Sequence, residues 1–583
     1  MLIRTAAIVF AFVTALSAQA PDLIVHHAKV VTVDPQFRIV QAFAVRGDRI
    51  VAVGTNKEVL ASKGANTKVV DAGGRTILPG LIDSHVHAAG ASMYEFDHEI
   101  PTMETVADVL RYIKSRAAVV PKGEWISLSQ VFITRLKEQR YPTRAELDSA
   151  APDHPVIFST GPDASVNTLA LKVSGITKDT QPPPGRPGKV EVDPKTGEPT
   201  GILRTASQFV KDARARRRPT MDDRLRRLKM MLADYNSVGL TSVAERNASD
   251  ADMELYGTLR RQNELTCRVF LSAHIEPAQA WEKVEAQILR LAKHPLHKYD
   301  PWLWLRGVKA FMDGGMLTGS AYMREPWGLS KIYSITDPNY RGMRYIEPEP
   351  LYRAVRLALQ NDLQFTAHSQ GDGAVHALVD AYERVNREFP VRPQRPCITH
   401  ASFMSPEVVE KMQEVGVVAD MQPAWLERDG GTLRDQFGEA RMRYFHPYKS
   451  LFDAGVIAGG GSDHMQKIGS MRSINPYNPF YGMWVTLARQ PRWTNKPLHP
   501  QERLSREQAI RLYTTNNAFL LFGEKEKGSL EAGKLADFVV LDQDILACPL
   551  DQVKGITVAQ TWVGGKQVYD SASKKPVTVK GRE

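Results

Sequence analysis

The chain has 583 residues, of which 43% are hydrophobic and 24% charged, and its formal net charge is +10 at pH 7. This length is several times that of a typical domain, and the balanced composition excludes a disordered or fibrous protein. The basic excess is moderate, and the basic run at 211–229 carries no binding motif. We therefore expect an exposed helix face there and no nucleic-acid partner, although that run leaves a nucleic-acid-binding protein as a rival reading.

The first twenty residues predict a signal peptide, 1–20. One arginine precedes a short apolar run, and Ala18-Gln19-Ala20 supplies the small residues that signal peptidase reads. The run is too short to span a bilayer comfortably. We expect cleavage before Pro21 and a periplasmic or secreted protein without a stable membrane anchor; an uncleaved anchor is the alternative.

The two ends of the mature chain predict two parts of one small β-structure, 21–78 and 501–583. Residues 23–53 alternate apolar and polar side chains between turns, and 534–542 and 558–569 do the same. Neither end alone has enough strands for a stable core. We therefore expect them to pair into a composite β-sandwich, with the last helix of the larger domain preceding the C-terminal part.

Residues 79–500 predict an α/β fold, a TIM-like (β/α)8 barrel, because strand-like runs alternate with helical periodicity. The expected strands end near His87, Glu245, His274, Lys309, His368, His400, Gln422 and Asp463. A Pro-rich stretch from about 92 to 225 interrupts this rhythm after the first strand. It is too long for a plain connection and predicts an inserted subdomain over the barrel mouth.

Histidines mark four of these strand ends, and those at three of them are candidate metal ligands; His274 is a weaker candidate for substrate contact. His85 and His87 lie at i and i+2 of one strand, so both side chains share a face and can reach one metal ion. His368 and His400 each close an apolar or β-branched run. Singly, each is more often a half-buried structural histidine, but together they can complete a second nitrogen site beside the first.

A lysine and an aspartate stand at two further strand ends. Burial lowers the pKa of an amine, and a neutral Lys309 amine can take up carbon dioxide to form a carbamate that bridges two metal ions. The alternative is a lysine that reaches solvent or pairs with Asp313. Asp463 follows a glycine run and can ligate metal and accept the proton of an attacking water; otherwise it caps a turn.

These segments resemble one family, the amidohydrolase superfamily, and within it the amidohydrolase 3 group often called YtcJ-like. The matching segments are LPGLIDSHVH, GVKAFMDGG, HSQGDGAV, THASFMSPE, GSDH and EKGSLEAGKLADFVVLD. The inserted portion is similar too, for example at 123–126, 152–156 and 197–201. The resemblance covers nearly the whole mature chain.

The resemblance implies a barrel with a composite β-sandwich, one or two divalent ions, usually zinc, and hydrolysis of an amide or related C–N bond. Carried over by position, the metal ligands are His85, His87, Lys309, His368, His400 and Asp463. Asp463 is also the implied acid and base, and no other cofactor is implied. A small-molecule substrate is the expected partner, and a homodimer is left open.

Two departures from the family pattern lie where substrate is expected. The group usually has a histidine shortly before Val166-Asn167, where this chain has Gly161-Pro162-Asp163-Ala164-Ser165. It commonly has a small residue and proline after the final aspartate, where this chain has His464-Met465. The substrate is therefore not copied from relatives, and a deaminase, an esterase or a catalytically silent secreted binding or regulatory protein are alternatives.

Overall fold

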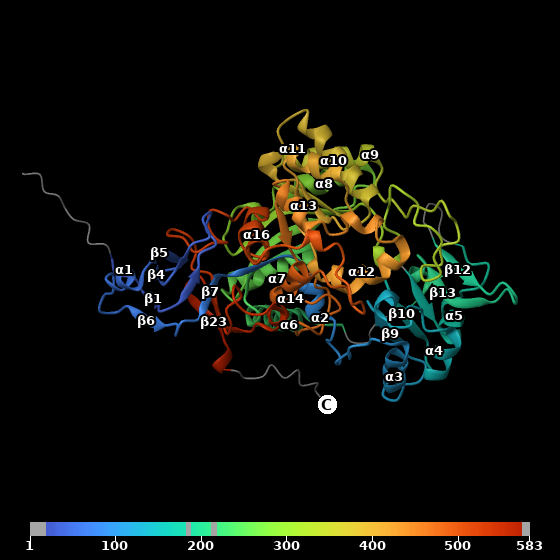
Figure 1. Cartoon of the computed structure of the whole chain (residues 1–583). Coiled ribbons are helices and arrows are strands. Elements are labelled where there is room, and N and C mark those ends of the chain that lie inside the picture. The colour runs from blue at the N-terminus through green and yellow to red at the C-terminus, as the bar shows by residue number, and fades with distance from the viewer. Residues whose placement is uncertain (1–18, 162, 182–187, 212–217, 574–583) are drawn as a thin grey trace, which may run out of the picture.

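The computed structural model describes residues 19–161, 163–181, 188–211 and 218–573. Five predicted segments fall partly outside this range: the signal peptide, the first departure at Pro162, the insertion at 182–187, the basic run at 212–217 and the C-terminal part at 574–583. Within the described part, no helix is long and apolar enough to cross a membrane. Figure 1 shows a central barrel with a β-sandwich at one end and the inserted portion at the other.

The β-sandwich combines both ends of the chain, as expected. One sheet is N-terminal and has the order β5 (Arg49–Gly54), β4 (Ala42–Arg46), β1 (Leu23–His26), β6 (Lys68–Asp71). The other has the order β23 (Lys566–Asp570), β22 (Val558–Val563), β21 (Phe538–Leu541), β7 (Thr76–Pro79), β2 (Lys29–Val31), β3 (Ile39–Val40). The antiparallel pair β7 and β21 joins the two ends, with Leu78 opposite Val539.

The barrel has eight strands in sequential parallel order, which confirms the predicted fold class. They are β8 (Leu81–Val86), β14 (Leu240–Ala248), β15 (Arg268–His274), β16 (Leu303–Phe311), β17 (Gln364–Ser369), β18 (Cys397–His400), β19 (Val418–Met421) and β20 (Ala458–Gly460). The first and last strands meet at an isolated parallel bridge between Val86 and His464. The strands are almost entirely buried, as expected for a sheet covered by helices.

Helices follow the strands and enclose this core. They are α6 (Met221–Ser237), α7 (Asp250–Arg261), α8 (Trp281–Ala292), α9 (Pro348–Gln360), α10 (Asp372–Asn386), α11 (Pro406–Val415), α12 (Pro423–Phe437), α13 (Tyr448–Asp453), α14 (Pro479–Ala488), α15 (Arg506–Leu512) and α16 (Thr515–Leu520). Local sequence fixes several starts: Thr220 and Ser249 form capping boxes, and Ser405 caps α11 ahead of a proline. The basic run overlaps the first part of α6. There Arg227 is buried and donates a hydrogen bond to Ser92 O.

The portion between β8 and α6 forms a separate five-stranded sheet. Its order is β12 (Lys189–Val192), β13 (Pro199–Arg204), β11 (Ala164–Val166), β10 (Val156–Ser159), β9 (Ile126–Ser129). Helices α3 (Val106–Ala117), α4 (Arg144–Ala150) and α5 (Thr168–Ser174) accompany it. This sheet has its own buried clusters, while a short 3-10 turn, Ile133–Arg135, reaches back to the barrel.

Candidate metal centre

The candidate centre begins at the seam between β8 and β20. The Asp463 N–H donates to His85 O at 2.8 Å, which sets the last predicted ligand beside the first. Gly461 permits this approach, because a Cβ there would lie 2.8 Å from the Cβ of His85. Asp463 has a φ of 54°, in the left-handed region that non-glycine residues rarely adopt. The seam is therefore shaped to bring a carboxylate to the HxH pair.

Three ligand atoms converge at this seam. Nε2 of His85 and Nε2 of His87 are 3.3 Å apart, and Asp463 Oδ1 lies 3.2 Å from the first and 3.1 Å from the second. Of the described residues, these three form the group whose ligand atoms lie within 4.8 Å of one another. Both side chains thus lie on one face, as expected from the strand period.

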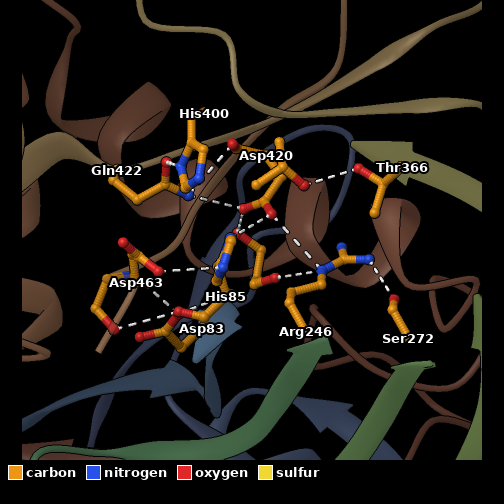
Figure 2. Close-up of polar contacts among 12 residues, drawn as sticks. Asp83, His85, Arg246, Ser272, Thr366, His400, Asp420, Gln422 and Asp463 are labelled. Atoms are coloured by element: carbon orange, nitrogen blue, oxygen red, sulfur yellow. Dashed lines mark hydrogen bonds and ion pairs between the residues drawn. The ribbon is translucent and has the colours of Figure 1, made fainter. Parts of the chain in front are cut away.

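Behind His85 lies Asp420, a buried carboxylate that organises the site (Figure 2). Asp420 Oδ2 lies 3.0 Å from His85 Nδ1, and its Oδ1 accepts a hydrogen bond from the Ser84 hydroxyl at 2.7 Å. The Arg246 guanidinium lies 3.6 Å from Oδ2 and also donates to Ser84 O. A carboxylate on Nδ1 places the imidazole proton there and leaves the Nε2 lone pair directed at the ligand cluster.

His87 also has a carboxylate behind it. Glu245 Oε1 lies 3.9 Å from His87 Nδ1, and Glu245 Oε2 accepts from the Ala89 N–H and the Tyr256 hydroxyl. Burial raises the pKa of Glu245 to about 7. Burial lowers the pKa of His87, but its bond to Asp463 and the charges of Asp463 and Glu245 outweigh this and raise it overall. His85 and His87 thus each have a buried carboxylate on the Nδ1 side of the ring.

His400 is oriented by Gln422, the residue that follows β19. Its Nδ1 lies 2.7 Å from Gln422 Oε1, and Gln422 Nε2 donates to Asp420 Oδ1 at 3.2 Å. The carbonyl oxygen of Gln422 therefore accepts a hydrogen bond from His400, and its amide nitrogen links His400 to Asp420. The His400 ring stacks on Trp425 with centroids 4.7 Å apart and lies 5.1 Å from the His85 ring. One Asp–Gln pair thus fixes histidines on both sides of the centre.

His368 and Lys309 complete the wall opposite the seam, less tightly. The His368 ring lies 4.6 Å from the His400 ring, and its Nε2 faces Gly314 O at 3.3 Å. Lys309 is 1% exposed, and within the described part of the chain its ammonium has no hydrogen bond or ion pair. Burial lowers the Lys309 pKa to about 8, although Asp463 and Asp420 oppose this. The alternative expected for Lys309, pairing with Asp313, does not occur. Asp313 instead accepts hydrogen bonds from the backbone N–H groups of 322, 370 and 371.

Asp463 is held from its far side by Asn475. The Asn475 Nδ2 donates to Asp463 O at 2.7 Å and lies 3.3 Å from Oδ2. Its Oδ1 accepts from Arg135 at 2.9 Å and from the Trp425 indole at 3.2 Å. Arg135 belongs to the inserted portion and makes a bidentate pair with Asp429 of α12. The insertion therefore contacts the catalytic candidate through one intervening side chain.

The chemistry of this donor set fits a divalent metal. Burial lowers the pKa of His85 and of His400 well below the usual range and that of His368 to about 3, so these rings are neutral. With its proton on Nδ1, His85 directs an Nε2 lone pair at Asp463 Oδ1 from 3.2 Å, an approach that a cation between the two atoms would stabilise. Such nitrogen and oxygen ligands suit zinc and its neighbours among divalent ions.

All six predicted ligand positions border the same end of the barrel, but only His85, His87 and Asp463 converge within ligand distance of one another. Gln422, expected as a strand end, is fully buried behind His400. His274 binds Asn247 Oδ1 at 2.7 Å. Asp163, from the first departure, is held by the Thr205 N–H and Arg204 within the insertion.

Sequence reasoning missed Asp420, Glu245, Arg246, Trp425 and Asn475. Asp420 left one readable signal, an acid inside the apolar run VVADM of β19. Glu245 was noted only as a strand end. Asn475 lies in a loop whose local sequence carries no such signal, since its partners come from three distant segments.

Comparisons with known proteins agree with this geometry. A family model described as "Amidohydrolase family" matches residues 68–569. The N-substituted formamide deformylase of Arthrobacter pascens is 29% identical over 95% of this chain and 99% of its own. Bacillus subtilis YtcJ is 25% identical over 90% and 97%. An uncharacterized metal-dependent hydrolase from Pyrococcus furiosus has a TM-score of 0.65 at 22% identity, covering 90% of this chain and 99% of its own.

Proposed function

Because the chain belongs to the amidohydrolase family, we propose that it is an exported metal-dependent hydrolase that cleaves an amide or related C–N bond. The observation that carries this proposal is the convergence of His85 Nε2, His87 Nε2 and Asp463 Oδ1 at the seam of the barrel. The formamide deformylase, similar over almost its whole length, supports C–N cleavage as the reaction class.

In this proposal His85, His87 and Asp463 hold one divalent ion, with zinc the expected metal. His368, His400 and Lys309 hold a second, with Lys309 as its carbamate. Burial lowers the Lys309 pKa to about 8, which supports the neutral amine that carbamate formation needs. When bound, the metal supplies Lewis acidity toward the scissile carbonyl and makes water a nucleophile near neutral pH.

The protein's own groups manage the protons and the geometry. Asp463 accepts the proton of the attacking water and returns it to the departing nitrogen. Asn475 donates toward Oδ2, so Asp463 Oδ1 stays directed at the two histidines. Asp420 and Gln422 fix the tautomers of His85 and His400, which keeps both Nε2 lone pairs available.

The test pairs metal analysis with a matched substrate panel. Purified full chain is assayed on N-substituted formamides, simple amides and cyclic amides, beside the corresponding esters and amino-substituted ring compounds. We expect about one or two divalent ions per chain and turnover of a C–N substrate that chelation removes and metal restores. Turnover of esters or ring amines alone would replace this proposal by the esterase or deaminase reading, and metal without any turnover would favour the binding-protein reading.

Export is proposed from the sequence of the first twenty residues. Intact-mass measurement of protein made in a bacterial host with a secretion pathway should find a chain beginning at Pro21 outside the cytoplasm. Retention of residues 1–20 in a membrane fraction would contradict cleavage. The hydrolase assignment does not depend on that outcome.

A further inference from the structure

A cavity of about 70 Å³ lies between the inserted portion and the loop that follows β20. One wall is Arg135, which reaches Asp463 through Asn475 by hydrogen bonds of 2.9 and 3.3 Å. Another wall is Gln466 and Lys467, three and four residues beyond Asp463. One water needs about 10–15 Å³, so the cavity has room for a group the size of a carboxylate.

The charged side chains that line this cavity are mostly cations. They are Arg135, Arg428, Lys467, Arg472 and Arg492, against a single carboxylate, Glu104. Each guanidinium already has an acid. Arg135 binds Asp429, Arg428 binds Glu427, Arg472 binds Glu95 and Glu99, and Arg492 binds Glu104. The lysine is the exception.

Lys467 is 5% exposed, yet no carboxylate of the described residues lies within 4.0 Å of its ammonium. The one hydrogen bond of Nζ in this part of the chain goes to Pro101 O at 3.0 Å, and Pro101 also lines the cavity. Glu95 and Glu99 act on the ammonium from farther away, but Arg472 already binds both at 2.8 Å. Burying an ammonium whose N–H donors lack acceptors is unfavourable in free energy unless an anion binds to it.

The backbone around Lys467 is built to place this ammonium. Lys467 has a φ of 62°, an uncommon conformation for a residue other than glycine. The turn is held by His464, whose Nε2–H donates to Gln466 O at 2.6 Å and to Lys467 O at 2.9 Å. His464 Nδ1 accepts from the Tyr235 hydroxyl at 2.7 Å. The residue that departs from the family pattern after Asp463 thus holds a strained turn that turns Lys467 inward.

We propose that this cavity is a substrate subsite in which Lys467 binds a carboxylate carried by the substrate. The inference rests on the proposed function and deepens it: the favoured substrate is a C–N compound with an anionic group at a distance from the scissile bond. The subsite lies on the Asp463 side of the centre, so it orients the substrate relative to the proton-transferring group. Binding leaves one carboxylate paired with one ammonium and forms no covalent bond.

The test measures binding without turnover, so that it stands apart from the hydrolase assignment. The probes are unreactive keto acids from 4-oxopentanoate to 7-oxooctanoate, each compared with its neutral amide by calorimetry on the purified full chain. We expect at least one acid to bind about tenfold or more tightly than its amide, because a charge-assisted hydrogen bond contributes about 1.5–3 kcal/mol. Lys467→Gln, which keeps a donor for Pro101 O, should bring that ratio close to one.

Lys122→Met is the matched control, because Lys122 is an exposed lysine of the insertion paired with Asp153. It should keep the wild-type ratio of acid to amide affinity. If Lys467→Gln fails to fold by circular dichroism, Lys467→Arg serves instead and should retain a preference for the acid. The inference is overturned if no acid binds more tightly than its amide, or if Lys467→Gln keeps the preference. It is also overturned if only inorganic phosphate shows Lys467-dependent binding, since the site would then serve a free anion.

Discussion

The two sides of the candidate centre differ in how many of their side chains have buried polar partners. On the seam side, His85, His87 and Asp463 meet at 3.1–3.3 Å, and each has a buried partner: Asp420, Glu245 and Asn475. On the opposite side, Lys309 has no polar partner among the described residues, and His368 faces a carbonyl. The seam side is therefore held by the protein alone. On the opposite side Gln422 also holds His400, whereas the positions of Lys309 and His368 depend on what occupies that half.

The largest effect is expected from removing a ligand on the seam side. His85→Ala or His87→Ala should reduce turnover to background and remove bound metal while the fold persists, because the ligands sit at the open end and the core lies below. Metal analysis, activity and circular dichroism measure this. His27→Ala, at an exposed histidine of the sandwich, should change none of them. Full metal content and turnover in either ligand variant would mean that the site is misassigned.

Substitutions of Lys309 test the side opposite the seam. Lys309→Ala should lose the second ion and most activity, and a short carboxylic acid in solution should restore part of it by supplying the missing anionic oxygen. Lys309→Arg should not recover activity, because a guanidinium stays cationic. Lys527→Ala is the control: Lys527 is half-buried and also has a pKa lowered to about 8, but it donates to Ser242. An active enzyme with an unmodified Lys309 ammonium would refute the binuclear reading.

Asp420 links the halves, since it contacts His85 directly and His400 through Gln422. Asp420→Asn should lower metal affinity or activity by about 10- to 100-fold, as is typical for partners of metal ligands. Metal titration separates the two effects. Asp300→Asn, which disturbs the remote pair with Arg260, should leave metal affinity at the wild-type value. Equal affinities for wild type and Asp420→Asn would show that the histidines are oriented without it.

The smallest effect should come from Asn475, which acts on Asp463 rather than on substrate. Asn475→Ala removes the donor to Asp463 Oδ2, and we expect kcat to fall about tenfold, the value of one bond to a charged group, with KM little changed. Asn361→Ala removes an amide-to-carbonyl bond at the end of α9 and should preserve both constants. A rise in KM at unchanged kcat would instead place Asn475 at the substrate.

Much of the fold could be read from the sequence because its determinants are local. Each barrel strand is a short apolar run, and the HxH pair follows from the strand period alone. The composite sandwich was expected because each end was too short by itself, although the N-terminal end completes one sheet alone. The fold class was predicted correctly on these grounds, and the family was predicted correctly from the segments that resemble it.

The partners of the ligands escaped prediction because their contacts are not local. Asp420 lies 335 residues from His85, and Arg135 lies 340 from Asn475. A buried acid becomes recognisable only when its donors are known, and those donors come from β8, β14 and the start of α12. Lys467 was equally hidden, since its isolation depends on which acids its neighbours have already taken.

The seam has a consequence for how the centre is assembled. The carboxylate ligand stands 378 residues after the first histidine, and Val86 and His464 pair only when the last strand has docked. A chain still being synthesised therefore carries the HxH pair without its acid. Tight metal capture becomes a late event, and metal content reports the fraction of molecules whose barrels have closed.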